Sequence, residues 1–432
     1  MPSENGGSSL ALFKDREFIA ITGTAFARSQ AYSTILIALA LYADLFSTTG
    51  TIEGLFGTTF ALIQLVIVLP LGRAIDTKDA KKFLLAGLLI NIAVFVGFMF
   101  VQNAVHVILI RIVQGLGASI LWITGSTIVG EISPDGARGR WLGTYNQVAA
   151  FSSLAGDLIG GYLLYAHGFK LTYILLSGVT LTAVVLAYLF LRDNPGGRKD
   201  PEEATSIETF RSLLGLPAIR ALTAFRLSFS FGKMAVVIFL PIFARKEFGI
   251  SALAIGGILA GGKLTKSLLQ GKMGDITDQL GHRHYFVFTG ALLYALGTIA
   301  IPFASTAEQL FPVITLGALG RSVTISGAFV SLFFAYSILG VADSFRLPAS
   351  MALYVEEGER YDAVASSMSL RSIAWKLGQI TGPLAVGAIK DAVSIAYGFW
   401  TAGGVVVISA GIFMVLYTRG QQAEAPLPAS GD

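Results

Sequence analysis

Eleven ionisable side chains lie inside long apolar stretches of this sequence, where a charge is costly. Nine are cations and two are carboxylates: Arg28, Arg111, Arg226, Lys233, Lys263, Lys266, Arg346, Arg371, Lys376, Asp157 and Asp343. A charge at the centre of a bilayer costs about 2.5–3.5 kcal/mol even on the mildest scale, so such residues mark functional or paired positions. Because the cations outnumber the carboxylates, counter-anions must come from a solute, from water or from neighbouring carboxylates. This pattern predicts a basic cavity that binds an anionic or acidic solute.

Helical spacing sorts these residues further. Thr24, Arg28 and Tyr32 recur every four residues and form one polar stripe. The predicted solute-binding residues are Arg28, Tyr32, Lys233, Arg346, Arg371 and Lys376. Arg371 and Lys376 are five apart and point in different directions, so we expect only one of them to reach the cavity. As an alternative to a cavity position, Arg226 and Lys266 lie close enough to a helix end to extend to the membrane surface.

Two carboxylates are candidates for carrying a proton across the membrane. A buried carboxylate exchanges its proton when a cation or a solute changes its surroundings. We therefore predict that Asp157 and Asp343 take part in proton coupling. The alternative is a static ion pair, such as Asp343 with Arg346. Asp44 and Glu53, at the outer ends of their helices, are expected to be solvated.

The composition indicates an all-α integral membrane protein. Of 432 residues, 54% are hydrophobic and only 13% are charged, whereas soluble domains carry about 25% charged residues. Apolar runs of about twenty residues recur, and each can span a bilayer. The net charge of +4 fits cations that flank membrane helices, and no nucleic-acid partner is expected. The absence of cysteine excludes disulfides, thiol catalysis and cysteine metal sites.

The chain divides into two bundles of six predicted helices each. The expected segments are a tail at 1–16, a bundle at 17–191, a polar linker at 192–217, a second bundle at 218–418 and a tail at 419–432. Seventeen lysines and arginines fall on the side of the two tails and five on the other side. This asymmetry predicts a multi-pass protein of the cell membrane with both termini in the cytoplasm.

The second bundle repeats the first. A shift of 202 residues superposes Gly72 on Gly274 and Asp76 on Asp278. Further along, a shift of 226 superposes two glycine pairs, Gly156 with Gly382 and Gly161 with Gly387. The two shifts differ by 24, which places an insert near 305–329. That insert is expected to be an outer loop, a re-entrant segment or a helix extension.

Several motifs resemble the major facilitator superfamily, and the resemblance covers essentially the whole chain. Residues 71–82 and 273–283 resemble its motif A and the second copy of that motif. Residues 111–118, Arg-Ile-Val-Gln-Gly-Leu-Gly-Ala, match its motif B, the most specific match in the chain. This resemblance implies that Arg111 and Gln114 take part in proton coupling, with a structural role for Arg111 as the alternative. Residues 378–383, Gly-Gln-Ile-Thr-Gly-Pro, are similar to motif C of drug–proton antiporters, while Asp157 stands where that motif has proline on helix 5.

The resemblance implies two six-helix bundles that rock around a central cavity. Gly72, Asp76, Gly274, Asp278, Gly382 and Pro383 are then expected to gate the motion. The function we expect is secondary active transport of a small organic solute, coupled to protons, with export favoured by the motifs. Uptake of an anionic metabolite is the alternative, and a channel or membrane enzyme is more distant. We expect a monomer in the bilayer, no enzymatic activity, no cofactor and no metal site.

Overall fold

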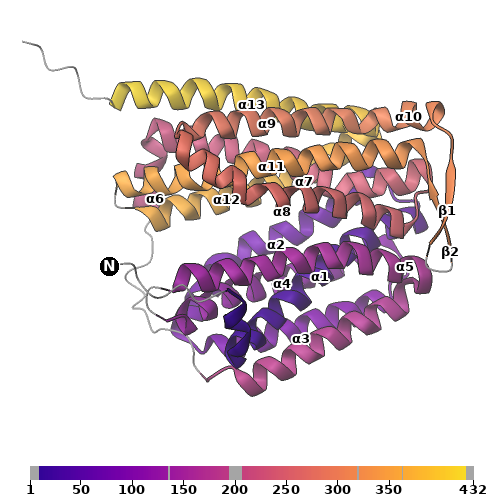
Figure 1. Cartoon of the computed structure of the whole chain (residues 1–432), viewed down its shortest axis with the longest axis horizontal. Helices are drawn as coiled ribbons and strands as arrows, with labels where there is room; N and C mark the ends of the chain where they lie inside the picture. Colours follow the sequence, from indigo (N-terminus) through magenta and orange to yellow (C-terminus); the bar gives the residue numbers. More distant parts are fainter. Residues whose placement is uncertain (1–8, 135–136, 194–206, 319–320, 362, 425–432) are drawn as a thin grey trace, which may run out of the picture.

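A computed structural model of the chain describes residues 9–134, 137–193, 207–318, 321–361 and 363–424. Long helices dominate it, and they run roughly parallel to one another (Figure 1). The first half contains the short 3-10 helix η1 (Ser9–Lys14), α1 (Arg16–Leu45), α2 (Gly50–Thr77), α3 (Ala80–Met99), α4 (Ala104–Ile132) and α5 (Arg138–Phe190). The second half contains α6 (Ile207–Gly215), α7 (Pro217–Phe248), α8 (Ala252–Leu280), α9 (Arg283–Ala300), α11 (Gly327–Arg360), α12 (Val364–Ala392) and α13 (Ile395–Glu424).

The 53-residue stretch of α5 is two helices rather than one. At about 1.5 Å per residue it would measure roughly 80 Å, far more than the 30 Å of a bilayer core. Gly168 breaks it with φ 71° and ψ −169°, a conformation that favours glycine. Nine helical segments of the described residues are apolar and long enough to span a membrane, counting α5 once. Splitting α5 and adding the equally long but more polar α1 and α12 gives the twelve expected helices.

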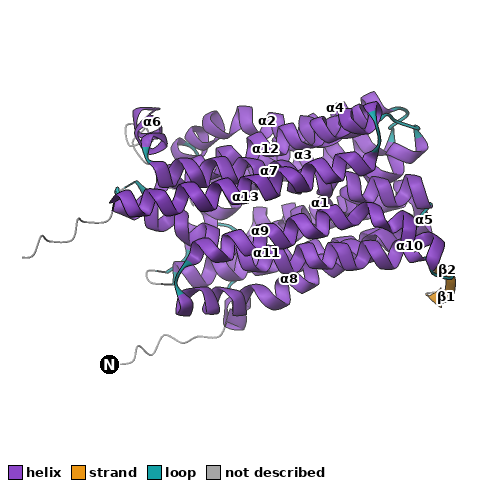
Figure 2. Cartoon of the chain, turned by 90° about the horizontal axis from the view of Figure 1, so that it is seen from above, coloured by secondary structure: helices purple, strands orange, loops and turns teal. Residues whose placement is uncertain are grey.

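The helices form two bundles, as predicted. One contains α1 to α5 and the other α7 to α13, drawn below and above in Figure 1, and in the view from above the two bundles overlap (Figure 2). Helix ends follow local chemistry: Asp15 caps α1 by accepting hydrogen bonds from the backbone of Glu17 (2.8 Å) and Phe18 (3.0 Å). We call the face at which α1 begins and α13 ends the terminal face, and the opposite one the far face.

The insert lies at the far face and contains strands, which the sequence analysis did not anticipate. After the 3-10 turn η3 (Ile301–Phe303) come the short helix α10 (Ala304–Leu310) and the antiparallel pair β1 (Ile314–Ala318) and β2 (Arg321–Ile325). Glu308 ties this insert to α11 by accepting a hydrogen bond from the Ala328 backbone (2.7 Å). The insert is therefore a hairpin on a helical base, unlike any of the three expected forms.

Two boundaries on the terminal face differ from the expected segments. The linker contains α6, whose Leu213 packs against Ile219 of α7 and Leu370 of α12. The last helix continues to Glu424, past the expected start of the tail at 419. Lys81 anchors the end of the first bundle by donating to Asp193 (2.8 Å), and this hydrogen bond lowers the pKa of the Asp193 carboxyl.

Candidate functional site

The two bundles meet closely along two seams in the far half of the molecule. We call them the α5–α8 seam and the α2–α12 seam. In the first, a Cβ on Gly161 would lie 2.8 Å from the Ala252 carbonyl oxygen. In the second, a Cβ on Gly54 would lie 2.5 Å from the Pro383 carbonyl oxygen. Backbone therefore meets backbone at both seams, and only glycine permits this approach.

The repeated glycines of the sequence are the residues that make these contacts. Gly161 faces α8 from α5, and its repeat mate Gly387 faces Gly50 of α2 from α12. The other pair packs helices within each bundle, because Gly156 meets Gln30 of α1 and Gly382 meets Phe231 of α7. The duplication has thus preserved a pattern of close helix contacts.

Ion pairs between the bundles cover the far ends of the seams. Glu53 is fully buried and accepts hydrogen bonds from Lys390 (2.6 Å) and Lys246 (3.0 Å). Asp44 pairs with Arg245 (2.8 Å). The expectation that Asp44 and Glu53 are solvated is therefore wrong for Glu53 and only partly right for Asp44, whose side chain is 39% exposed. Sequence reasoning missed these pairs because their partners lie about 200 or more residues away.

Polar contacts also close the start of α2. Asp391 of α12 accepts hydrogen bonds from the backbone of Gly50 (2.5 Å) and Thr51 (2.8 Å), so a residue of one bundle caps a helix of the other. The far face is therefore sealed by backbone contacts, ion pairs and a shared helix cap.

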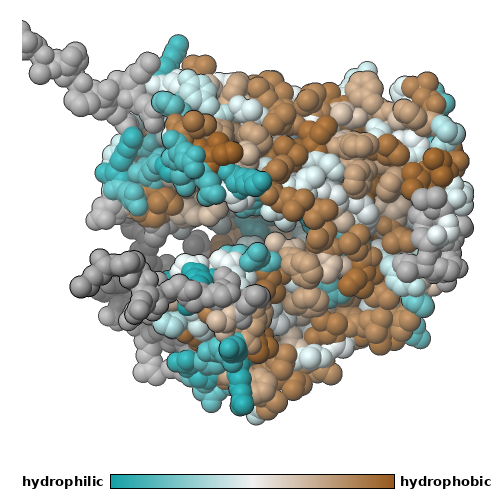
Figure 3. All heavy atoms as spheres, viewed as in Figure 1, coloured by the Kyte–Doolittle hydropathy of each residue, from teal (hydrophilic) through white to brown (hydrophobic). Residues whose placement is uncertain are grey.

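The terminal face has a different character. A Cβ added to Gly72 or Gly274 would meet no atom within 4 Å. A hollow opens between the two bundles at the left edge of Figure 3, which is the terminal face. Asp278 is exposed and pairs with Arg283 (2.7 Å), while the side chain of Asp76 lies outside the described residues. The bundles are thus apart where the predicted motif A gates lie.

Asp157 forms an ion pair across the α5–α8 seam. Its carboxylate is fully buried and lies 2.6 Å from the ammonium of Lys263 on α8. Lys263 also donates to the hydroxyls of Ser33 and Ser153, each at 2.8 Å. The sequence analysis predicted a role for Asp157 but did not identify Lys263 as its partner. This buried pair joins the two bundles near the middle of the membrane.

Asp343 lies within the second bundle and has two cationic partners. Its carboxylate contacts the ammonium of Lys233 and lies 2.9 Å from a guanidinium nitrogen of Arg346. The static pairing with Arg346, given above as an alternative, is therefore present. Lys233 and Arg346 are not unmatched charges, although this one carboxylate balances only one of them.

The other predicted residues have neutral partners. Lys376 contacts the amide oxygen of Gln64 across the α2–α12 seam and lies 3.3 Å from that of Gln379. Arg28 is buried against the ring of Trp122 (4.5 Å), which is itself 65% exposed. Tyr32 packs against Phe60. The residues predicted to bind solute therefore lie on several helices around the interface, rather than in one cluster.

The contacts that the structure describes for Arg111 all lie within its own bundle. It donates to the Phe56 carbonyl oxygen (2.7 Å) and to Gln114 (2.6 Å), and it lies over the ring of Phe60 (4.1 Å). These contacts join α4 to α2. Arg111 and Gln114 therefore have a role in holding α4 against α2. Their predicted role in proton coupling remains a proposal.

Arg226 does not take the position at the membrane surface that was the alternative to a cavity position. It is 6% exposed and stacks on the ring of Trp375 (4.2 Å), so it does not extend to the membrane surface. Arg371, one helical turn before Trp375, is partly buried. These two arginines belong to a group of buried cations in the second bundle.

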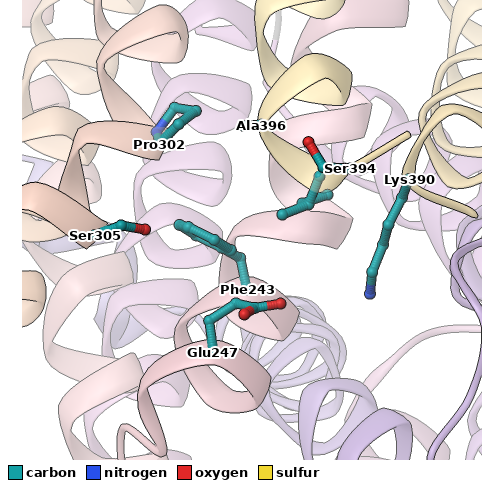
Figure 4. Close-up of a pocket in the computed structure, with 8 residues that line it drawn as sticks. Phe243, Glu247, Pro302, Ser305, Lys390, Ser394 and Ala396 are labelled. Carbon is teal, nitrogen blue, oxygen red and sulfur yellow. The ribbon is translucent and has the colours of Figure 1, made fainter.

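A cavity of about 290 Å³ opens at the far face, away from these charges. It lies between α7, the η3 turn and the start of α13 and is lined by Phe243, Glu247, Pro302, Ser305, Lys390, Ser394, Ile395 and Ala396 (Figure 4). Its cation, Lys390, is already paired with Glu53. The cavity is therefore peripheral to the interface between the bundles.

A duplicated membrane protein with two helical bundles, sealed at one face and apart at the other, has the architecture of an alternating-access transporter. Comparison with known proteins supports this class. The family model of the Major Facilitator Superfamily matches residues 21–327 and 227–432. The chain therefore belongs to the Major Facilitator Superfamily and is a multi-pass membrane transporter, not an enzyme.

Individual relatives are distant. The multidrug resistance protein MdtG of Serratia proteamaculans is 26% identical over 400 residues, covering 90% of this chain and 89% of that protein. The uncharacterized MFS-type transporter YuxJ of Bacillus subtilis is 25% identical, covering 80% and 82%. A crystal structure of a bacterial homolog of the human lysosomal transporter Spinster, inward-facing and unoccupied, has a TM-score of 0.77 at 15% identity and covers 98% of this chain. That likeness concerns the fold.

Proposed function

We propose that this transporter exports a small anionic or acidic organic solute across the cell membrane, driven by protons. The observation that best supports a transporter is the contrast between the two faces. Backbone contacts, ion pairs and a helix cap join the bundles at the far face. At the terminal face, a Cβ on Gly72 or Gly274 would have no neighbour within 4 Å. If the terminal face is cytoplasmic, as the distribution of lysine and arginine predicts, this is the inward-facing state.

The charge of the interior supports an anionic solute. After Asp157 pairs with Lys263 and Asp343 with Lys233 and Arg346, the buried cations still exceed the carboxylates. Arg28 and Lys376 have aromatic or amide partners that bind a cation without neutralising it. A solute carboxylate or phosphate entering from the terminal face would meet this excess of positive charge.

Proton coupling is assigned to Asp157. Its ion pair with Lys263 crosses the seam that must open when the far face opens. Protonation removes the carboxylate charge and with it the attraction that holds α5 against α8. A proton arriving from the far face would thus favour opening on that side, and its release on the other side would favour closure. The similarity to MdtG supports efflux as the direction.

The proposal is tested with the purified protein in liposomes that carry a pH gradient. We expect saturable accumulation of a radiolabelled organic anion in wild-type liposomes, and loss of its dependence on the pH gradient in Asp157→Asn. Exchange at zero gradient should persist in that variant, because solute binding is intact. Arg28→Ala should reduce transport of anions, whereas Arg220→Ala, at the exposed start of α7, should not. Full proton-driven accumulation by Asp157→Asn would reject the coupling role.

A further inference from the structure

Three arginines gather in the second bundle between its terminal end and Asp343. Arg226 is on α7, Arg346 on α11 and Arg371 on α12. Arg226 and Arg371 lie nine and seven residues from the starts of their helices, which is roughly 10–14 Å from the terminal face at 1.5 Å per residue. The hollow between the bundles opens at this face (Figure 3). The group therefore lies toward the end of the bundle that borders this hollow, and Arg371 is the most exposed of the three.

Aromatic rings hold two of the three guanidinium groups, those of Arg226 and Arg346. Arg226 stacks on Trp375, one turn beyond Arg371 on α12 (4.2 Å), and Arg346 stacks on Phe229, one turn beyond Arg226 on α7 (3.7 Å). Ser230 binds the Trp375 carbonyl oxygen (2.6 Å), which fixes α12 against α7. The three cations are close enough to repel one another electrostatically.

Most of their hydrogen-bond donors have no partner among the described residues. The unpaired buried atoms are Nε and Nη1 of Arg226, Nε and Nη1 of Arg346, and Nε of Arg371. The hydroxyl of Ser350, one turn beyond Arg346 on α11, is also buried without a partner. Arg226 and Arg346 are 6% and 1% exposed. Leaving charged donors unsatisfied at such burial is costly, so the arrangement calls for a ligand that accepts hydrogen bonds.

The charge balance defines that ligand further. Asp343 is the one carboxylate that pairs with any of the three arginines in the described chain, and Lys233 already balances it. The three arginines and Lys233 carry four positive charges against the one negative charge of Asp343, so three positive charges remain in excess. A carboxylate offers two acceptor oxygens and one charge, whereas a phosphate or phosphonate head offers three oxygens and up to two charges. Guanidinium groups bind such planar or tetrahedral oxyanions through paired N–H donors.

We propose that Arg226, Arg346 and Arg371 form a binding site for a doubly charged oxyanion group, such as a phosphate or phosphonate, on the transported solute. Trp375, which is only partly buried, binds the adjoining apolar part of that solute. The inference rests on the proposed function only in taking the occupant to be the transported solute. It requires neither a direction of transport nor proton coupling.

Thermal unfolding of the purified full-length protein tests this site. We expect phenylphosphonate to raise the Tm, and acetate or chloride at the same ionic strength not to. Neutralising one arginine in Arg226→Gln or Arg371→Gln should weaken phenylphosphonate binding roughly tenfold or more, as expected for a buried charged hydrogen bond. The matched control Arg220→Gln removes an exposed arginine of the same helix and should bind as wild type does.

The unliganded proteins separate a binding role from a structural one. Among the residues that the structure describes, Arg226 and Arg371 have no acidic partner, so their neutralisation relieves repulsion and should leave the unliganded Tm unchanged or higher. Equal stabilisation by acetate, or unchanged phenylphosphonate binding in both variants, would overturn the proposal. So would a lower unliganded Tm in both variants together with no response of the wild type to phenylphosphonate.

Two further arms identify the source of the group and separate this inference from the proposed function. Dodecylphosphonate binding more tightly than phenylphosphonate would assign the site to an amphipathic, lipid-like solute, and the reverse order would assign it to a soluble one; either result supports the oxyanion site.

Phosphonate binding without flux in liposomes would reject the proposed function and leave the site intact. Saturable flux of monocarboxylates that survives in Arg226→Gln and Arg371→Gln would reject the site and leave the function intact.

Discussion

The α5–α8 and α2–α12 seams are related by the internal repeat, yet their polar centres differ. Both rely on glycines that bring backbones together, Gly161 and Gly256 at one and Gly54 and Gly387 at the other. At mid-depth the first seam has the Asp157–Lys263 ion pair, whereas the second has Lys376 against the neutral Gln64. At this depth, therefore, only the first seam of the described chain has a carboxyl whose protonation would weaken the contact, because the carboxylates of the second, Glu53 and Asp391, lie at its far end.

This difference suggests a division of labour. Duplication gave both seams the same backbone fit, which any closed state of the far face needs. The mid-depth carboxylate Asp157 makes the first seam sensitive to a proton inside the membrane, whereas Lys376 and Gln64 at the same depth of the second seam are not joined by a carboxylate. Substitutions of the shared glycines, of the polar centres or of the ion pairs at the rim can test this division of labour.

The largest effect is expected from filling a shared glycine. In Gly256→Leu the new side chain would collide with the Asp157 backbone, and in Gly54→Leu with Pro383. Overpacking of this kind costs about 1–3 kcal/mol where the structure can shift, so both variants should open the far face and lose most transport. Spin labels on introduced cysteines at Leu45 and Val393, which are 62% and 64% exposed, would report a longer distance. The chain has no native cysteine to interfere.

A matched control is available on α13. A Cβ on Gly404 would meet nothing within 4 Å, so Gly404→Leu should leave both the label distance and the transport unchanged. An unaltered distance in Gly256→Leu would show that the α5–α8 seam is not needed for closure. Opening by Gly54→Leu alone would assign closure to the other seam.

The polar centres should be distinguished by their effect on stability, where the label distance between the bundles changes less than in the glycine variants. Removing one member of a buried ion pair costs about 3–5 kcal/mol, while replacing both members is often nearly neutral. We therefore expect Asp157→Asn or Lys263→Met to lower the Tm strongly and the double variant to recover most of it. The corresponding cycle with Gln64→Leu and Lys376→Met should show weaker coupling, about 1–2 kcal/mol, because the partner is uncharged. Equal coupling energies in the two cycles would remove the asymmetry proposed here.

Much of the architecture could be predicted from the sequence, because membrane constraints act locally. The lengths of the apolar runs predicted the twelve helices. The repeat of Gly156 and Gly161 at Gly382 and Gly387 marks residues that the structure places at helix contacts. Charged residues in apolar runs drew attention to Asp157, which the structure pairs with Lys263, and to the pairing of Asp343 with Arg346. The role of Asp157 in proton coupling stays a prediction. These signals work because lipid makes each unpaired polar group expensive.

The partners could not be predicted, because they depend on how two bundles dock. Nothing near Asp157 points to Lys263, and nothing near Glu53 points to Lys390, which is 337 residues away. Arg226 was a candidate for the membrane surface because its distance from the helix start allows it, but the ring of Trp375 on another helix holds it inside. The hairpin of the insert was missed because its short strands lie outside the bundles, where lipid imposes no pattern.

The smallest effect is expected at the rim of the far face, where the seams reach water. Asp44 and Arg245 are 39% and 32% exposed, and ion pairs of this kind contribute about 0–1 kcal/mol. Asp44→Asn should therefore shift the label distance between Leu45 and Val393 only slightly, and raising the salt from about 0.05 to 0.5 M should remove the difference from wild type. Glu53 is fully buried between two lysines, so Glu53→Gln should have a larger effect that persists at high salt. A salt-sensitive Glu53→Gln would mean that water reaches this cluster, and the seal would then depend on the two glycine seams alone.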